Sequence, residues 1–332
     1  MGYHCFEVET EDNVAHLRMS RPDELNTLCR EFWSELPEIV REIDASASAR
    51  AIVISSTGRH FTAGLDLGML AGEIVDQNAE VGRARANLRE LVLHLQDSIS
   101  CLEQARMPVL AAIQGGCVGG GVDLVTACDM RYCTEDSWFC IQEINIGLTA
   151  DVGTLQRLPK IVPDGLAREL AYTGRRMPAT RAREIGLVNE VYADQETMLE
   201  AVMQTAREIA ERSPLAIWGT KEMLNYTRDH SVAEGLNYIA TWQAGMFFGE
   251  DMQESFKAKQ DKRAPVFQDL PPVRKKPCDA PLEGSPKHLE QRALAAHLPD
   301  LSAPRGGAAC EPIRPDAQAP LTPVPNSRDW AW

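Results

Sequence analysis

The stretch 108–133, PVLAAIQGGCVGGGVDLVTACDMRYC, decides the fold class of this chain. Its apolar start, PVLAAIQG, reads as a buried strand, the glycines at 119–121 open a helix, and MRYC at 130–133 reads as the next strand. Strands and helices that follow one another in this way favour an α/β fold, in which helices pack outside the sheets. We therefore predict an α/β core around this stretch.

The alternation continues on both sides of this stretch. Residues 6–19, FEVETEDNVAHLRM, predict a hairpin whose turn contains Asp12 and Asn13. Further patterns predict a helix at about 27–43, a strand at 51–56 and a helix at about 84–105. Beyond residue 195 the strand patterns stop and helical segments follow, the best at 196–212 and 214–226. We predict a core with the functional site at 1–195 and a helical region at 196–267 that acts as a lid or in oligomerisation.

The remaining segment, 268–332, is predicted to be a proline-rich disordered tail. From Pro271 onward it holds twelve of the chain's twenty prolines and few aliphatic runs. Trp330 and Trp332 are unusual in such a tail, so an interaction segment remains the alternative.

Composition excludes several classes of partner. The formal net charge of −14 disfavours nucleic acid and anionic membranes, because phosphate binding needs clustered Lys and Arg. No apolar run approaches the roughly 18 residues of a membrane span, and the N-terminal residues show no targeting signal. The nine cysteines include no CxxC pair, so we expect reduced, mostly buried thiols and no zinc site.

The glycines at 115, 116 and 119–121 lie where a strand passes into a helix. Glycine lets the backbone approach a ligand closely, and a helix start presents free N–H groups that stabilise negative charge. An oxyanion or a phosphate would fit there, although the pattern is not that of a phosphate loop, GxxxxGK[ST]. Tight helix–strand packing is the alternative explanation of these glycines.

A second informative stretch is QEINIGLTADVGTLQRLP at 142–159, which contains Glu143 and Asp151. Carboxylates in a mostly apolar segment are costly to bury unless they are paired or used in chemistry. Asp151 has a simpler alternative role as the N-cap of a short helix that begins near Val152 or Gly153.

Together with RHFTAGLDL at 59–67, these stretches resemble the enoyl-CoA hydratase/isomerase (crotonase) superfamily over about residues 6–265. The resemblance implies a crotonase-like spiral of ββα units with a C-terminal helical oligomerisation region. Hydratases of this superfamily are expected to carry glutamates at the positions of Asp123 and Glu143, and a glycine at that of Asp151. The Asp, Glu and Asp found here instead resemble the dienoyl-CoA isomerase branch.

That branch implies conversion of 3,5-dienoyl-CoA to 2,4-dienoyl-CoA in the β-oxidation of unsaturated fatty acids. By carry-over, the backbone N–H groups of Leu65 and Gly120 would form the oxyanion hole for the thioester enolate. Asp151 would be the base at C2 and Glu143 the acid at C6. Asp123 would raise the pKa of Glu143 by like-charge repulsion, or would be an ordinary carboxylate of a helix first turn.

The resemblance also implies how the substrate is held. The expected substrate-binding residues are Ala63, Gly64, Leu65, Asp66, Leu67 and Gly121, and the expected partners of the CoA phosphates are Arg59, Lys257 and Lys259. Walls of the acyl pocket would come from residues near 70–95. No cofactor is expected, since CoA is part of the substrate.

By the same resemblance we expect a homo-hexamer, built as a dimer of trimers, in the mitochondrion or the peroxisome. The nearest alternatives are an enoyl-CoA hydratase and a 3,2-enoyl-CoA isomerase, which would share the fold and the oxyanion hole. An alternative of another class is a non-catalytic binding protein with the crotonase fold.

Overall fold

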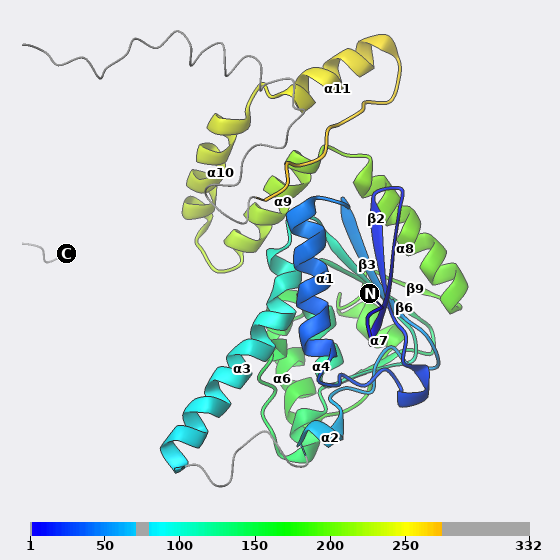
Figure 1. Cartoon of the computed structure of the whole chain (residues 1–332), viewed down its shortest axis with the longest axis vertical. Coiled ribbons are helices and arrows are strands. Elements are labelled where there is room, and N and C mark those ends of the chain that lie inside the picture. Colours follow the sequence, from blue (N-terminus) through cyan, green and yellow to red (C-terminus); the bar gives the residue numbers. More distant parts are fainter. Residues whose placement is uncertain (1, 71–79, 274–332) are drawn as a thin grey trace, which may run out of the picture. The chain divides into compact units, whose positions relative to one another are not determined.

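The computed structural model describes residues 2–70 and 80–273. Its main sheet has six strands in the order β1-β2-β3-β4-β6-β9 (Figure 1). The first two, β1 (Phe6–Glu11) and β2 (Val14–Met19), form the predicted antiparallel hairpin, and Asp12 and Asn13 have the positive φ angles that its two-residue turn requires. The following strands are parallel to β2: β3 (Ala51–Ser56), β4 (Val109–Ile113), β6 (Met130–Thr134) and β9 (Glu190–Tyr192).

A second, three-stranded sheet lies beside the main one and consists of β5 (Gly116–Val118), β7 (Trp138–Cys140) and β8 (Met177–Pro178). A bridge between Thr62 and Cys117 extends this sheet by one further segment. After each of β3, β4 and β6 in the main sheet, the chain forms a short extended segment in the small sheet, at Thr62, β5 and β7, before its next helix. This arrangement is the spiral of ββα units that the resemblance implied.

Both faces of the main sheet are buried at its central strand β3. On one face Ile52 and Ile54 pack in the larger core with α1 (Phe32–Ser46), α3 (Val81–Gln104) and α4 (Gly120–Ala127). On the other face Ala51 and Val53 pack with α8 (Gln195–Ala210), as Figure 1 shows. The strand AIVISS is apolar at successive positions because its residues alternate between two cores. Helix α8 therefore packs on the main sheet as part of the core, although the core predicted from the sequence ended at residue 195.

The remaining helices are α2 (Leu67–Leu70), α5 (Thr154–Ile161), α6 (Asp164–Thr173), α7 (Ala179–Glu184), α9 (Pro214–Thr227), α10 (Val232–Met246) and α11 (Glu250–Asp261), with 3-10 turns η1 (Pro22–Glu24) and η2 (Glu143–Ile146). Some of these helices follow the sequence patterns at 154–158 and beyond 195, whereas α2, α6 and α7 were not predicted. In the segments 2–70 and 80–273, no helix is long and apolar enough to cross a membrane.

Two expectations from the sequence need correction. The helix predicted from about Thr27 begins at Phe32, because Leu28 instead pairs with the loop at 64–66: its N–H donates to the Gly64 carbonyl at 2.9 Å. The predicted disordered tail also starts too early, since residues 268–273 are bound to the core. The Asp269 carboxylate accepts from Arg50 at 2.7 Å, and Val273 N–H donates to the Ala45 carbonyl at 2.8 Å. The rest of that tail, including Trp330 and Trp332, lies outside the described residues.

Candidate active site

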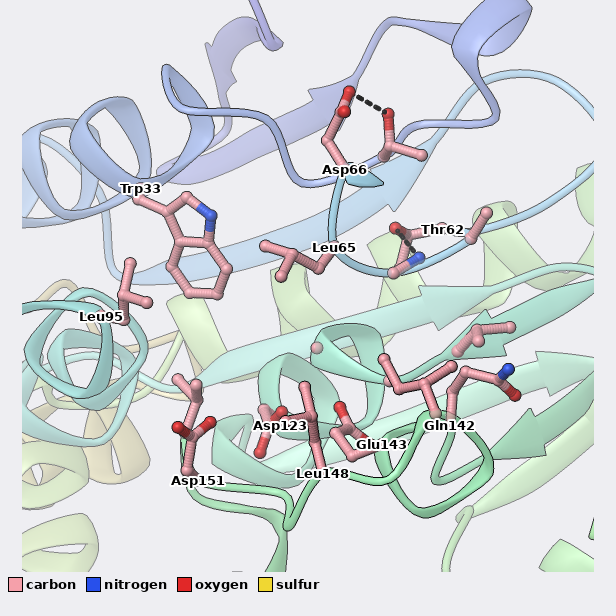
Figure 2. A pocket seen from close by; sticks show the side chains of 18 of the residues that line it. Trp33, Thr62, Leu65, Asp66, Leu95, Asp123, Gln142, Glu143, Leu148 and Asp151 are labelled. Atoms are coloured by element: carbon pink, nitrogen blue, oxygen red, sulfur yellow. Dashed lines mark hydrogen bonds between the residues drawn. The ribbon is translucent and has the colours of Figure 1, made fainter. Parts of the chain in front are cut away.

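A cavity of about 950 Å³ opens between the loop at 62–66, the start of α4 and the segment 142–152 (Figure 2). Its fourth wall is apolar and comes from one face of α3, formed by Leu88, Leu91, Val92 and Leu95. The spacing of these residues places them on a single side of the helix. Part of the predicted acyl wall, 70–95, is thus found, whereas its residues 71–79 lie outside the described part of the chain.

Close backbone packing brings Leu65 and Gly120 to the same cavity. Gly64 has a φ of 91°, and a Cβ built on it would lie 2.8 Å from the Val118 carbonyl oxygen. Gly120 is the first residue of α4, and a Cβ there would lie 2.7 Å from Leu28 Cδ1. Among the described residues, neither the Leu65 nor the Gly120 N–H donates to a protein acceptor. Two free amides are therefore available for an oxyanion.

Glu143 lies in the same cavity, next to the start of α4. Its Oε1 is 3.1 Å from the position that a Cβ on Gly119 would occupy, so the carboxyl group packs against the residue before Gly120. Its Oε2 is buried and has no hydrogen-bond partner in the described structure. Burial, then the nearby carboxylates of Asp123 and Asp151, raise the pKa of Glu143 to about 7.

Asp123 lies in the first turn of α4, and its side chain is 1% exposed. Its Oδ1 accepts a hydrogen bond from the Thr154 N–H at 2.6 Å, so this carboxylate satisfies a free donor at the start of α5. Burial raises the pKa of Asp123 to about 6, although the bond from Thr154 opposes that shift. Asp123 thus has the first-turn position in α4 that the sequence predicted, and its negative charge raises the pKa of Glu143. Its bond to the start of α5 was not predicted from the sequence.

Asp151 lines the cavity and is accessible from it. Its backbone carbonyl accepts from Gln96 Nε2 of α3 at 2.7 Å, and burial raises the pKa of its carboxyl group. The N-cap alternative for Asp151 is wrong, since Gly153 is the N-cap residue of α5 and Asp123 binds the helix start from another element. The Asp151 carboxyl group is therefore available to a ligand.

The predicted binding residues divide into two groups. Ala63, Gly64, Leu65, Asp66 and Gly120 line the cavity. Gly121 does not line it: a Cβ there would lie 2.4 Å from Thr62 Cγ2, so this glycine serves the packing of α4 on the loop. Leu67 begins α2, and its side chain lies outside the described part. Arg59, Lys257 and Lys259 are exposed and do not line the cavity as far as it is described, so their contact with phosphates stays a prediction.

The structure adds a polar cluster to the cavity that the sequence analysis missed. The Arg176 guanidinium lies 3.9 Å from the ring centroid of Trp138, and His60 packs edge-on against the same ring. His60 Nδ1 accepts from the Gly116 N–H at 2.9 Å, so in the neutral ring the proton is on Nε2. These residues come from three distant segments, and no local pattern joins them.

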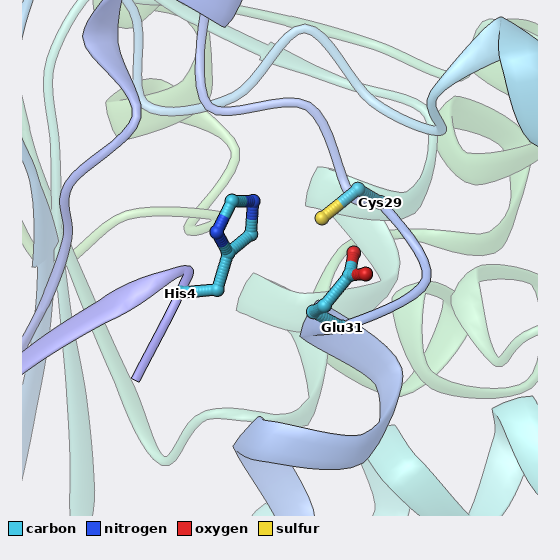
Figure 3. A group of neighbouring side chains, drawn as sticks. All are labelled: His4, Cys29 and Glu31. Atoms are coloured by element: carbon cyan, nitrogen blue, oxygen red, sulfur yellow. The ribbon is translucent and has the colours of Figure 1, made fainter. Parts of the chain in front are cut away.

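One group of described side chains has donor atoms close enough to share a metal ion. His4, Cys29 and Glu31 each offer one atom, and these atoms lie within 4.8 Å of one another (Figure 3). The group lies at the start of α1, and none of its members is among the described residues that line the cavity.

Comparison with known proteins gives a consistent picture. The model of the enoyl-CoA hydratase/isomerase family matches residues 9–270. The chain is 44% identical over 255 residues to the mitochondrial Delta(3,5)-Delta(2,4)-dienoyl-CoA isomerase of Homo sapiens, covering 76% of this chain and 78% of that protein. It is 41% identical over 263 residues to the peroxisomal protein of the same name from Arabidopsis thaliana, covering 79% and 95%.

Solved structures agree with the fold. A putative enoyl-CoA hydratase from Streptomyces coelicolor A3(2) superimposes with a TM-score of 0.73 at 29% identity, covering 82% of this chain and 96% of that one. An enoyl-CoA hydratase from Bacillus anthracis gives a TM-score of 0.72 at 28% identity, with 82% and 100% covered.

Proposed function

The chain belongs to the enoyl-CoA hydratase/isomerase family, and from that premise we propose that it isomerises 3,5-dienoyl-CoA to 2,4-dienoyl-CoA by transferring protons between two carboxylates and a thioester enolate. The reaction belongs to the β-oxidation of unsaturated fatty acids. Identity of 41–44% to dienoyl-CoA isomerases supports the activity. The observation that carries it is Asp151, a second accessible carboxylate in the cavity that already holds Glu143.

The enolate would form at the two free amides. With the thioester oxygen between the N–H groups of Leu65 and Gly120, removal of a C2 proton sends the electron pair toward that oxygen and along the conjugated chain to C6. Each donor of this kind is worth roughly 3 to 4 kcal/mol in acyl chemistry. A proton added at C6 then leaves double bonds at C2 and C4, so one proton is lost and one is gained.

The geometry supports a different order of proton transfer from the one assigned from the sequence. C2 is next to the carbonyl carbon, and Glu143 packs against Gly119, the residue before the Gly120 amide. Asp151 lies on the side of Leu95 and Trp33, whereas Glu143 lies on the side of Gln142 (Figure 2). We therefore assign Glu143 as the base at C2 and Asp151 as the acid at C6. Asp123 strengthens the base, because its negative charge disfavours ionised Glu143.

We expect kcat/KM to fall above pH 7. Turnover needs one proton on the pair Glu143 and Asp151, since one carboxyl group accepts while the other donates. The pKa of Glu143 is raised to about 7, so above this value the pair loses its last proton and the rate falls by about tenfold per pH unit. An Asp123→Asn variant lacks a negative charge that raises the pKa of Glu143, so its kcat/KM should begin to fall at lower pH. A profile that stays flat to pH 9 would contradict the assignment.

The substrate class is tested by two assays run side by side. The protein is incubated with a 3,5-dienoyl thioester and with a 2-enoyl thioester, and we expect the diene to be isomerised faster than the enoyl substrate is hydrated. Faster addition of water would identify a hydratase, and a faster shift of a 3-enoyl substrate would identify a 3,2-enoyl-CoA isomerase. Turnover of none of them would favour a non-catalytic binding protein.

Several properties accompany this function. Acyl-CoA is the substrate, the mechanism uses no further cofactor, and the compartment is the mitochondrion or the peroxisome, as for the relatives named above. We propose a homo-hexamer of two trimers assembled through the C-terminal helices. Exposed Leu224, Val232 and Leu236 border a groove between α9 and α10, which supports an interface there.

A further inference from the structure

The turn that carries Asp151 is held from behind by an arginine that does not touch the cavity. Gly153 has a φ of 134°, and a Cβ built on it would lie 1.7 Å from Arg157 Nη1. The guanidinium therefore lies directly against the Gly153 backbone, where any side chain would displace it. The same Nη1 donates to the Val152 carbonyl at 3.3 Å.

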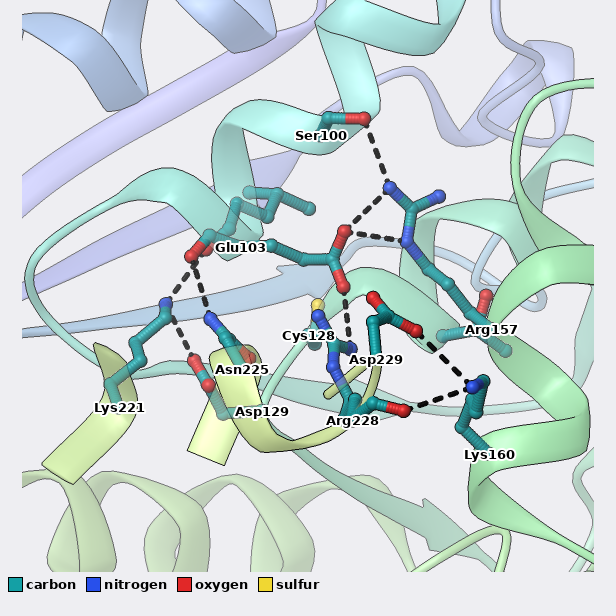
Figure 4. Close-up of polar contacts among 12 residues, drawn as sticks. Ser100, Glu103, Cys128, Asp129, Arg157, Lys160, Lys221, Asn225, Arg228 and Asp229 are labelled. Atoms are coloured by element: carbon teal, nitrogen blue, oxygen red, sulfur yellow. Dashed lines mark hydrogen bonds and ion pairs between the residues drawn. The ribbon is translucent and has the colours of Figure 1, made fainter. Parts of the chain in front are cut away.

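The Arg157 guanidinium is itself fixed by α3 (Figure 4). Its Nε donates to Glu103 Oε2 at 2.8 Å, its Nη2 lies 2.6 Å from the same oxygen, and its Nη2 donates to Ser100 Oγ at 3.0 Å. The side chains of Arg157 and Glu103 are only 11% and 18% exposed. A forked contact with a carboxylate at this burial holds the guanidinium in a single orientation.

Further charged groups complete the surroundings of this pair. Glu103 Oε1 lies 2.7 Å from Arg228 Nη1 at the end of α9. Lys160 of α5 forms an ion pair with Asp229 at 3.2 Å and donates to the Arg228 carbonyl at 3.0 Å. Arg228 thus shares Glu103 with Arg157, but it has no contact with the turn at 151–154 among the interactions of the described residues.

The turn carries the proton-transferring Asp151 and is bonded to Asp123, the carboxylate near Glu143. Asp151 opens it, and Thr154, which closes it, donates its N–H to Asp123. A displacement of Val152 and Gly153 would therefore move the acid and weaken the contact that orients Asp123 beside Glu143.

We propose that Arg157 is a positioning residue of the isomerisation, which holds the turn 151–154 so that Asp151 faces the cavity and Thr154 reaches Asp123. The inference rests on the proposed function. The positive charge of Arg157 also supports the base Glu143. It lowers the pKa of Asp123, and ionised Asp123 raises the pKa of Glu143. Two carboxylates face Asp123 as well: Asp151 raises the pKa of Asp123, and repulsion between Asp123 and Glu143 raises the pKa of Glu143.

Three variants of the full chain test this role: Arg157→Gln, Arg157→Lys and, as matched control, Arg228→Gln. The control removes one cation from the same Glu103 and leaves the turn untouched. We expect Arg157→Gln to lower kcat by on the order of a hundredfold with little change in KM, because misplacement of a reacting group by about 1 Å has an effect of this size. The fall of its kcat/KM at high pH should also begin at lower pH. Arg157→Lys should keep the wild-type pH profile and recover part of kcat, and Arg228→Gln should stay close to wild type.

Thermal unfolding of each variant separates folding from positioning. Equal losses of kcat in Arg157→Gln and Arg228→Gln, or a folded Arg157→Gln with unchanged kcat and pH profile, would overturn the inference. The inference would also be overturned if a smaller fraction of folded protein accounted for the whole loss of kcat in Arg157→Gln. Wild-type protein without activity on 3,5-dienoyl thioesters would instead refute the proposed function, so the two failures are distinguishable.

Discussion

Replacement of Asp151 by asparagine is expected to lower kcat on 3,5-dienoyl-CoA by about 10³-fold, or about 4 kcal/mol of transition-state stabilisation. Asparagine has nearly the same shape but cannot donate a proton at C6, so the dienolate returns to substrate. KM should change little, because the amides of Leu65 and Gly120 and the apolar wall of α3 are intact. Formation of the 2,4-diene is followed by its absorbance.

Asp97→Asn serves as the matched control for this variant. Asp97 lies on α3 next to Gln96, which binds the Asp151 carbonyl, but its carboxylate pairs with Arg41 at 2.6 Å and does not line the cavity as described. We expect activity close to wild type. An Asp151→Asn protein that retains most of its kcat would remove Asp151 from the chemistry and leave a mechanism with Glu143 alone.

Replacement of Glu143 by glutamine should lower kcat by a similar factor of about 10³, for a different reason. Glutamine cannot accept the C2 proton, so no dienolate forms. Recovered substrate tells the two variants apart when the reactions are run in D₂O. We expect Asp151→Asn to incorporate deuterium at C2, since Glu143 still removes and returns a proton there. Glu143→Gln should leave C2 unlabelled.

The opposite labelling pattern would restore the order assigned from the sequence, with Asp151 at C2 and Glu143 at C6. Mass spectrometry of the recovered thioester gives the number of deuterons, and NMR gives their position. Asp97→Asn is again the control, and it should label as the wild type does. Equal labelling of C2 in both carboxylate variants would point to a third base, for which Asp123 is the adjacent group.

Several features of the site could be predicted because they are local in the chain. The glycines at 119–121 mark the start of α4, where the Gly120 amide is free, and the carboxylates at 123, 143 and 151 were found within recognisable motifs. The order of proton transfer assigned from the sequence differs from the order that we propose from the structure. Both carboxylates lie in one short segment, and nothing in that segment tells which of them is nearer the carbonyl carbon. Their positions relative to the carbonyl carbon depend on Gly119, a residue of another segment against which Glu143 packs.

By itself, the sequence determined the α/β class and the hairpin, since both depend on the spacing of residues close together in the chain. Its resemblance to the crotonase superfamily singled out the three carboxylates. Only the tertiary structure decided which groups meet. It brought Leu65 and Gly120 to one cavity, bonded the start of α5 to Asp123 instead of Asp151, and placed Arg157 against the turn that carries Asp151. The physical reason is that burial, pKa and hydrogen-bond partners depend on elements packed together in space, and a periodic pattern reports only which face of its own element is apolar.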